Sequence, residues 1–278
     1  MSKAKKNKAI PTRAETADRH RLYELAVQCA EAEIDFVDNT YKKLRGRRAR
    51  LLREDFCGTA NVCCEWVRRC KQNRAIGVDL DPEVLDWGRT HRLGALKPGQ
   101  AGRISLLQKN VLTVHTEEAP DIVSAMNFSY WLFKERKELK GYFRQVHQQL
   151  ADDGIFFMDA YGGYDSFREI EEEREIEDGD QTFTYVWEQA KYEPISGGLI
   201  CHIHFDFPDG SRLERAFSYD WRLWTLPEIR ELLTEAGFKR ITVYWQGFDA
   251  DGEPDGDFKP VSEGDADAGW ICYLSAEK

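Results

Sequence analysis

The chain has 278 residues and a formal net charge of −10, with 42% hydrophobic and 12% aromatic residues. This length fits one large domain, or one domain with an insert, and the apolar share is ample for a packed core. The negative charge argues against a general nucleic-acid binder. No apolar run reaches the roughly 18 residues that a membrane span needs, and no signal peptide opens the chain. We therefore expect neither nucleic acid nor a membrane as a partner.

Seven cysteines are an odd number and form no C-x-x-C pair. This favours a reduced, cytoplasmic protein over a disulfide framework. Cys57, Cys63, Cys64 and Cys70 cluster in the sequence, but their spacing fits no common zinc pattern. We interpret them as small buried residues and predict no metal site.

The N-terminal region divides into two parts. Residues 1–16 are lysine-rich and lack periodicity, which predicts a disordered basic tail. Residues 17–45 predict a helix, broken at most once, that buries one apolar face. The residues available for that face are Leu22, Leu25, Ala26, Ile34, Phe36 and Val37.

Residues 51–81 read as a strand, a tight turn at Gly58, a helix and a second strand that ends at Asp79. Nucleoside-binding folds have this layout: a strand, a glycine turn and a helix, with an acid about 20 residues after the glycine. The glycine lets the backbone come close to the ligand, and the carboxylate accepts hydrogen bonds from a ribose diol. This stretch therefore predicts a nucleoside-containing ligand.

The glycine pattern indicates which nucleoside. A nicotinamide dinucleotide needs G-x-G-x-x-G for its pyrophosphate, and that pattern is absent. Glu54 and Asp55 would repel a pyrophosphate but suit a ligand with an amino group and a sulfonium. The stretch resembles the first motifs of class I S-adenosylmethionine-dependent methyltransferases, D/E-x-G-x-G-x-G. Phe56 replaces the first glycine and Ala60 the third; alanine is a small change there and phenylalanine a larger one.

The resemblance implies S-adenosylmethionine as the cofactor and S-adenosylhomocysteine as its product. It also implies that the helix before the first motif covers the cofactor, with Tyr23 and Gln28 as candidates to face the pocket. The other implied cofactor contacts are Glu54, Asp55, Gly58 and Thr59 near the methionine end, Asp79 and Leu80 at the ribose and adenine, and Asn110 and Val111 at the adenine.

The pattern of alternating strands and helices continues to Asp159. We predict helices at 83–92 and 136–150, and strands at 104–108, 121–127 and 155–159. Asn127 is at the end of the fourth strand and should emerge at the carboxyl edge, where open α/β sheets bind ligands. It is the predicted residue at the methyl-transfer edge and a candidate cofactor contact.

The pattern changes over residues 161–224. Residues 166–177 are highly charged and predict a helix, and three period-two segments then predict an antiparallel β-meander at 183–188, 199–205 and 213–221. This insert looks like the acceptor-covering element of small-molecule N-methyltransferases. Tyr161 is a second catalytic candidate. The pair His202 and His204 is open to two interpretations, a catalytic base or a polar strand face.

At the C-terminus we predict a helix over 226–236, capped by Thr225, and strands at 241–245 and 270–274 joined by a surface loop over 249–268. The resemblance implies that the last strand inserts antiparallel. The predicted fold is α/β: a Rossmann-like seven-stranded methyltransferase sheet with an inserted antiparallel β-meander after the fifth strand.

The predicted function is methyl transfer from S-adenosylmethionine to nitrogen or oxygen of a small-molecule substrate, by a monomer or homodimer. The alternatives are a protein or RNA methyltransferase and a catalytically silent S-adenosylmethionine-binding protein. The predicted regions are a disordered basic tail (1–16), N-terminal lid helices (17–45), a cofactor-binding core (46–160), an inserted helix and meander covering the substrate (161–224), and a C-terminal helix with the last two core strands (225–278).

Overall fold

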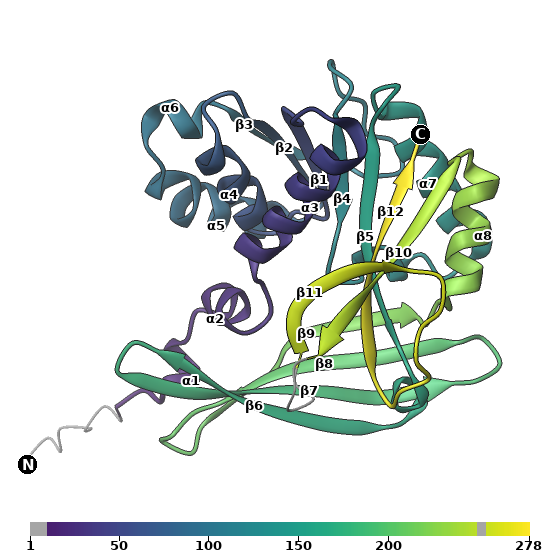
Figure 1. Cartoon of the computed structure of the whole chain (residues 1–278). Coiled ribbons are helices and arrows are strands. Elements are labelled where there is room, and N and C mark those ends of the chain that lie inside the picture. The colour runs from purple at the N-terminus through teal and green to yellow at the C-terminus, as the bar shows by residue number, and fades with distance from the viewer. Residues whose placement is uncertain (1–9, 249–253) are drawn as a thin grey trace, which may run out of the picture.

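The computed structural model describes residues 10–248 and 254–278. Its centre is an eight-stranded sheet with the order β11-β10-β12-β5-β4-β1-β2-β3 (Figure 1). The strands are β1 Leu51–Asp55, β2 Arg74–Asp79, β3 Ile104–Gln108, β4 Ile122–Ala125, β5 Ile155–Gly162, β10 Arg240–Phe248, β11 Pro254–Val261 and β12 Trp270–Glu277.

The first five strands run parallel, and β12 pairs antiparallel with both β5 and β10. The predicted Rossmann-like sheet and its antiparallel last strand are confirmed. The prediction of a surface loop over residues 249–268 is wrong for Pro254–Val261. These residues form β11, which pairs antiparallel with β10 and adds an eighth strand to the sheet. Residues 249–253 of that loop lie outside the described residues.

Helices cover both faces of this sheet (Figure 1). α3 Ala30–Arg45, α4 Asn61–Arg69 and α5 Pro82–His91 form one core with the first strand. α7 Arg136–Gln149 and α8 Leu226–Ala236 pack on the other side. The predicted Thr225 cap is confirmed and forms a capping box with Glu228. At the start of α5, the Asp81 side chain accepts the Glu83 N–H.

A second, four-stranded antiparallel sheet has the order β6-β7-β8-β9 and lies below the carboxyl ends of the parallel strands in Figure 1. Its strands are β6 Ile170–Asp178, β7 Gln181–Glu193, β8 Gly198–Asp206 and β9 Arg212–Arg222. The predicted meander is confirmed. The predicted helix over 166–177 is wrong, because these residues form β6, whose backbone pairs with β7 along its whole length. Tertiary pairing has overridden the helical propensity of a glutamate-rich segment.

The N-terminal helix is broken once, as predicted, into α2 Arg19–Ala26 and α3. Residues 10–16 correct the prediction of a disordered tail: α1 Arg13–Thr16 begins at a capping box on Thr12, and the Arg13 N–H donates to Asp209 at 2.8 Å. Residues 1–9 of the predicted tail lie outside the described residues. α2 packs its Leu22 and Ala26 against the second sheet. The short elements are η1 Leu93–Ala95, α6 Pro98–Ala101, η2 Ser129–Leu132 and η3 Tyr164–Phe167.

The seven cysteines are all free thiols, and those at the glycine turn and on α4 (Cys57, Cys63 and Cys64) are buried. In the part of the chain that the structure describes, no helix combines the length and apolar character needed to cross a membrane.

Candidate active site

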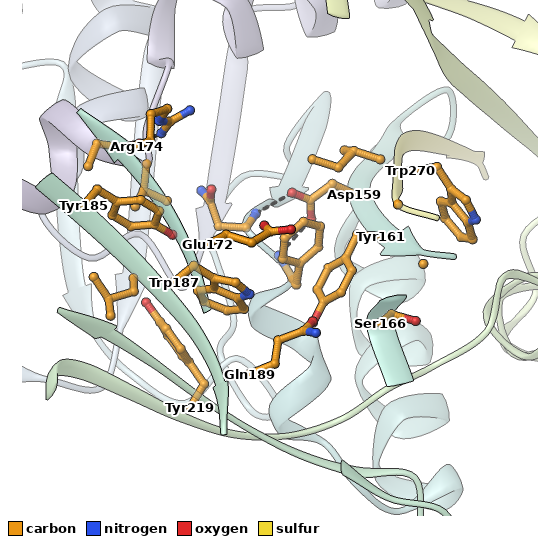
Figure 2. A pocket seen from close by; sticks show the side chains of 18 of the residues that line it. Asp159, Tyr161, Ser166, Glu172, Arg174, Tyr185, Trp187, Gln189, Tyr219 and Trp270 are labelled. Atoms are coloured by element: carbon orange, nitrogen blue, oxygen red, sulfur yellow. Dashed lines mark hydrogen bonds between the residues drawn. The ribbon is translucent and has the colours of Figure 1, made fainter. Parts of the chain in front are cut away.

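Two adjoining cavities lie at the carboxyl edge of the main sheet. The first, of about 660 Å³, is lined by Gly58 and Asp79 and is called the turn cavity. The second, of about 710 Å³, is lined by Tyr185 and Trp187 of β7 and is called the meander cavity (Figure 2). Among the described residues, six line both cavities and are called the junction. They are Tyr23, Glu33, Met126, Asn127, Tyr219 and Trp221.

The glycine turn has left-handed backbone at alternate positions. The φ angles of Phe56, Gly58 and Ala60 are 59°, 51° and 60°. These are the three positions at which the resembled motif has glycine, and a side chain in this conformation costs about 1–2 kcal/mol. Ala60 is therefore a more strained replacement than we expected. The Phe56 ring offsets part of its cost by packing against Phe133 and Tyr142.

Gly58 leaves open space in the turn cavity, because a Cβ placed on it would meet nothing within 4 Å. The turn is supported from both sides. Asp79 Oδ2 accepts the Gly58 N–H at 2.8 Å, and its Oδ1 accepts the Asp81 N–H at 3.0 Å. From below, α5 approaches so closely that a Cβ on Gly88 would lie 2.5 Å from the Thr59 carbonyl oxygen.

The two acids before the turn have different surroundings. Glu54 lines the turn cavity, its Oε2 accepts the Cys63 N–H at 3.0 Å, and burial raises its pKa to about 7. Asp55 also lines the cavity, but its carboxylate forms a fully buried salt bridge with Arg53 at 2.9 Å and accepts the Tyr142 hydroxyl at 2.9 Å. Asp55 therefore braces the end of β1, whereas Glu54 is the acid better placed for a ligand.

Thr59 lines the turn cavity and connects the turn to the lid. Its hydroxyl donates to Glu24 Oε1 at 2.5 Å, and Glu24 also pairs with Arg92 at the end of α5. A single buried carboxylate on α2 thus holds both the turn and α5. Gln28 also lines this cavity, and its side-chain oxygen accepts a hydrogen bond from Asn61.

Leu80, Asn110 and Val111 lie outside the lining of both cavities. Leu80 is 62% exposed and Val111 is buried. Asn110 Oδ1 accepts the Leu112 N–H at 2.8 Å, so its carbonyl is used in a local turn. Their adenine contacts stay predictions.

Asn127 lies at the junction, where Asp159 fixes its backbone. Asn127 and Phe128 both have a φ of 56°. Asp159 Oδ2 accepts the Asn127 N–H at 2.7 Å and Oδ1 accepts the Phe128 N–H at 2.9 Å (Figure 2). Burial raises the pKa of Asp159 to about 7, while these two hydrogen bonds act in the opposite direction.

The structure brings Tyr23 to the junction and places Tyr161 deeper in the meander cavity. The Tyr23 ring packs against Phe217 of β9 with 4.9 Å between centroids. The buried Tyr161 hydroxyl has no hydrogen-bond partner in the described residues, and burial raises its pKa. Tyr161 does not line the turn cavity, which separates it from the predicted cofactor contacts.

The two histidines of β8 line neither cavity. His202 shares a hydrogen bond with Ser218 at 2.8 Å. His204 bonds to Glu188 at 2.9 Å, and its Nδ1 accepts the Arg215 N–H at 3.1 Å. The interpretation as a polar strand face fits these contacts.

Sequence reasoning missed Glu33 and the role of Asp159. Glu33 lies on the buried face of α3 beside Ile34, one turn from Ala30 and Val37. An acid at this position of an otherwise apolar face was the available signal. Asp159 was recognised only as the end of a strand; its capping of the turn after β4 comes from a different segment of the chain.

Comparison with known proteins places this geometry in context. Residues 55–158 match the family model described as methyltransferase domain. A Geobacillus sp. (strain WCH70) protein, provisionally named a methyltransferase, is 21% identical over 215 residues, covering 75% of this chain and 81% of its own. The chain is also similar to the structure of a S-adenosylmethionine-dependent methyltransferase from Clostridium acetobutylicum, with a TM-score of 0.65, 18% identity and coverage of 92% of this chain and 96% of the other.

A further similar structure is CalS10 from Micromonospora echinaspora, an amino pentose methyltransferase of calicheamicin biosynthesis, solved with S-adenosylmethionine bound. It gives a TM-score of 0.66 at 15% identity and covers 93% of this chain and 96% of its own. At these identities the two solved structures establish a shared fold over nearly the whole chain.

Proposed function

We propose that this chain is a class I S-adenosylmethionine-dependent methyltransferase and that it transfers the methyl group to nitrogen or oxygen of a small molecule held in the meander cavity. The observation that carries the proposal is the junction. Two cavities of similar size share one wall, so a cofactor in the turn cavity and an acceptor in the meander cavity would meet there.

The turn cavity fits S-adenosylmethionine in three respects. The space in front of Gly58 is open to a ligand. The Ser124 Oγ lines the cavity and is buried without a hydrogen-bond partner in the described part of the chain, so a ligand could satisfy it. Glu54 and Asp79 provide carboxylates for an amino group and a ribose diol. We propose these residues, together with Tyr23, as the groups that hold the cofactor.

The chain's own contribution to the reaction is alignment. Bound S-adenosylmethionine supplies an electrophilic methyl group, so the transfer needs little acid–base help and depends on placing the nucleophile in line. Asp159 fixes Asn127 at the junction through two backbone hydrogen bonds. Glu24 ties α2 to the turn, and Tyr23 of the same helix lines the junction.

The meander cavity favours a small acceptor over a macromolecule. It has the volume of a small-molecule site, and nine of its 28 described lining residues are aromatic. The net charge of −10 disfavours RNA. CalS10, whose fold this chain shares, is an amino pentose methyltransferase, which is consistent with a small acceptor here.

The test is tritium transfer from labelled S-adenosylmethionine into a cell extract that is then separated into small-molecule, protein and RNA fractions. We expect label in the small-molecule fraction, and none with the Asp79→Ala variant. Label in protein or RNA would overturn the proposed acceptor class. No label in any fraction, despite tight binding of S-adenosylhomocysteine, would favour a catalytically silent binding protein.

A further inference from the structure

Glu33 is a buried carboxylate at the junction, and one of its oxygens has no partner among the described residues. It lies on α3, is 6% exposed and lines both cavities. Its Oε2 is buried and has no hydrogen-bond partner within residues 10–248 and 254–278. Burying an unpaired carboxylate costs folding free energy. The presence of Glu33 at this position therefore points to a hydrogen-bond partner that a ligand supplies.

The two neighbouring carboxylates each accept a backbone hydrogen bond, which Glu33 does not in the described residues. Asp159 accepts two backbone N–H groups, and Glu54 accepts the Cys63 N–H. Burial raises the pKa of Glu33 well above its usual range, and repulsion from Glu54 and Asp159 acts in the same direction. A group that brings N–H donors and positive charge to the junction would relieve this repulsion. Such a group is an amine.

The walls around Glu33 suit the same chemistry. Tyr23, Tyr219 and Trp221 line the junction with it, and aromatic faces attract organic cations. Five acids line the meander cavity (Glu33, Asp159, Asp165, Glu172 and Glu173), and Arg174 is the one cation among its described lining residues. The Arg174 guanidinium donates to the Ala26 carbonyl and lies over the Tyr185 ring. The cavity therefore favours a cationic ligand.

We propose that Glu33 selects an amine as the methyl acceptor by accepting a hydrogen bond from its nitrogen, and that it takes the proton which the nitrogen releases. This inference rests on the proposed function and narrows it from nitrogen or oxygen to nitrogen. The bound ammonium first gives one proton to the Glu33 carboxylate, which frees the nitrogen lone pair. The nitrogen then forms the new N–C bond as the carbon–sulfur bond breaks with its electron pair remaining on sulfur, and the product is the methylated ammonium. Water then receives that proton.

The experiment compares two probes of equal size, phenethylamine and 2-phenylethanol, binding to the full chain saturated with S-adenosylhomocysteine. Wild type should bind phenethylamine at least about tenfold more tightly than 2-phenylethanol, because one hydrogen bond to a charged group has an effect of this size. In Glu33→Gln the preference should fall below about threefold. Glu31→Gln, an exposed acid on the same helix outside both cavities, is the matched control and should behave like wild type.

Equal or undetectable amine binding by wild type, or a preference that persists in Glu33→Gln, would overturn the inference. So would a selective loss of affinity for S-adenosylmethionine over S-adenosylhomocysteine in Glu33→Gln, because Glu33 would then serve the sulfonium. If Glu33→Gln does not fold, Glu33→Asp keeps the charge but shortens its reach, and the amine preference should fall. Failure of wild type to bind S-adenosylhomocysteine would instead contradict the proposed function.

Discussion

The two cavities are assembled in different ways. The turn cavity takes five of its polar groups from one stretch, Glu54 to Asp81, which folds locally as strand, turn, helix and strand. Within the described residues, the meander cavity has no such local segment and gathers residues from Tyr23 on α2 to Tyr273 on β12, with β7 and β9 between them. A site built from one segment leaves a readable motif in the sequence, whereas a site built from distant segments does not. The cofactor was therefore predictable and the acceptor was not.

The two cavities also differ in how they are braced. Below the turn cavity, Arg53 and Asp55 form a fully buried ion pair, and Glu24 ties Thr59 to α2. The meander cavity has no comparable buried ion pair among its described lining residues, and its buried Tyr161 hydroxyl has no hydrogen-bond partner in the described part of the chain. Unpartnered buried atoms line the turn cavity too, namely Ser124 Oγ and, at the junction, Glu33 Oε2. The two sites therefore differ in the ion pairs that support them, and each has a buried polar atom that a ligand could satisfy.

The largest expected effect comes from breaking the brace beneath the turn. Arg53→Met leaves Asp55 buried with only the Tyr142 hydroxyl as a partner, which should lower the free energy of unfolding by about 3–5 kcal/mol. Urea unfolding measures this loss. The exposed pair of Arg74 and Glu118 is the control, because Arg74→Met should cost less than about 1 kcal/mol. Equal losses in the two variants would show that the buried pair is not a brace.

The next effect is a change confined to the cofactor side. Gly88→Ala places a Cβ 2.5 Å from the Thr59 carbonyl, so the turn must shift, at about 1–3 kcal/mol. We expect the affinity for S-adenosylhomocysteine to fall at least about tenfold by calorimetry. Gly141→Ala, also inside a helix but with nothing within 4 Å of the new Cβ, should leave affinity unchanged. Unchanged affinity in Gly88→Ala would mean that α5 does not position the turn.

The corresponding change on the acceptor side is Gly162→Ala. A Cβ there would lie 2.2 Å from the Trp270 ring, which lines the meander cavity. Moving this ring should reduce methyl transfer into the small-molecule fraction several-fold, with the affinity for S-adenosylhomocysteine within about twofold of wild type. A parallel loss of both would show that the two cavities do not behave as separate sites.

The smallest effect is a pH dependence. Burial raises the pKa of Glu54 from 4.5 to about 7 in the folded protein, so the folded state holds this proton more tightly than the unfolded state. The contribution of Glu54 to stability is therefore greatest below pH 4.5 and is lost as pH rises through 7. Between pH 5 and pH 8, wild type should lose about 1–3 kcal/mol more unfolding free energy than Glu54→Gln. Parallel pH profiles from urea unfolding would contradict the raised pKa.

Most of the core was predictable because its signals are local. The alternation of apolar strands with capped helices gave the parallel sheet, and Gly58 with Asp79 gave the cofactor. Phe56 and Ala60 adopt the glycine conformation that their identities disfavour, because packing of the Phe56 ring and the fixed ends of β1 and α4 hold the turn.

The failures are non-local. The glutamates of β6 have helical propensity in isolation, and only pairing with β7 makes them a strand. β11 forms a strand because its backbone pairs with the edge strand β10. Glu33 and Asp159 are more than a hundred residues apart in the sequence, and helix–sheet packing brings both to the meander cavity. No sequence motif predicts this arrangement. Local periodicity carries no information about contacts between distant segments of the chain.

The central claim is that the turn cavity binds S-adenosylmethionine through the Gly58 turn and Asp79. Calorimetry with S-adenosylhomocysteine tests it most directly, using wild type, Asp79→Ala and the exposed control Asp86→Ala on α5. The account predicts micromolar binding by wild type and by Asp86→Ala, and a loss of at least about a hundredfold in Asp79→Ala. No binding by intact, folded wild-type protein would contradict it.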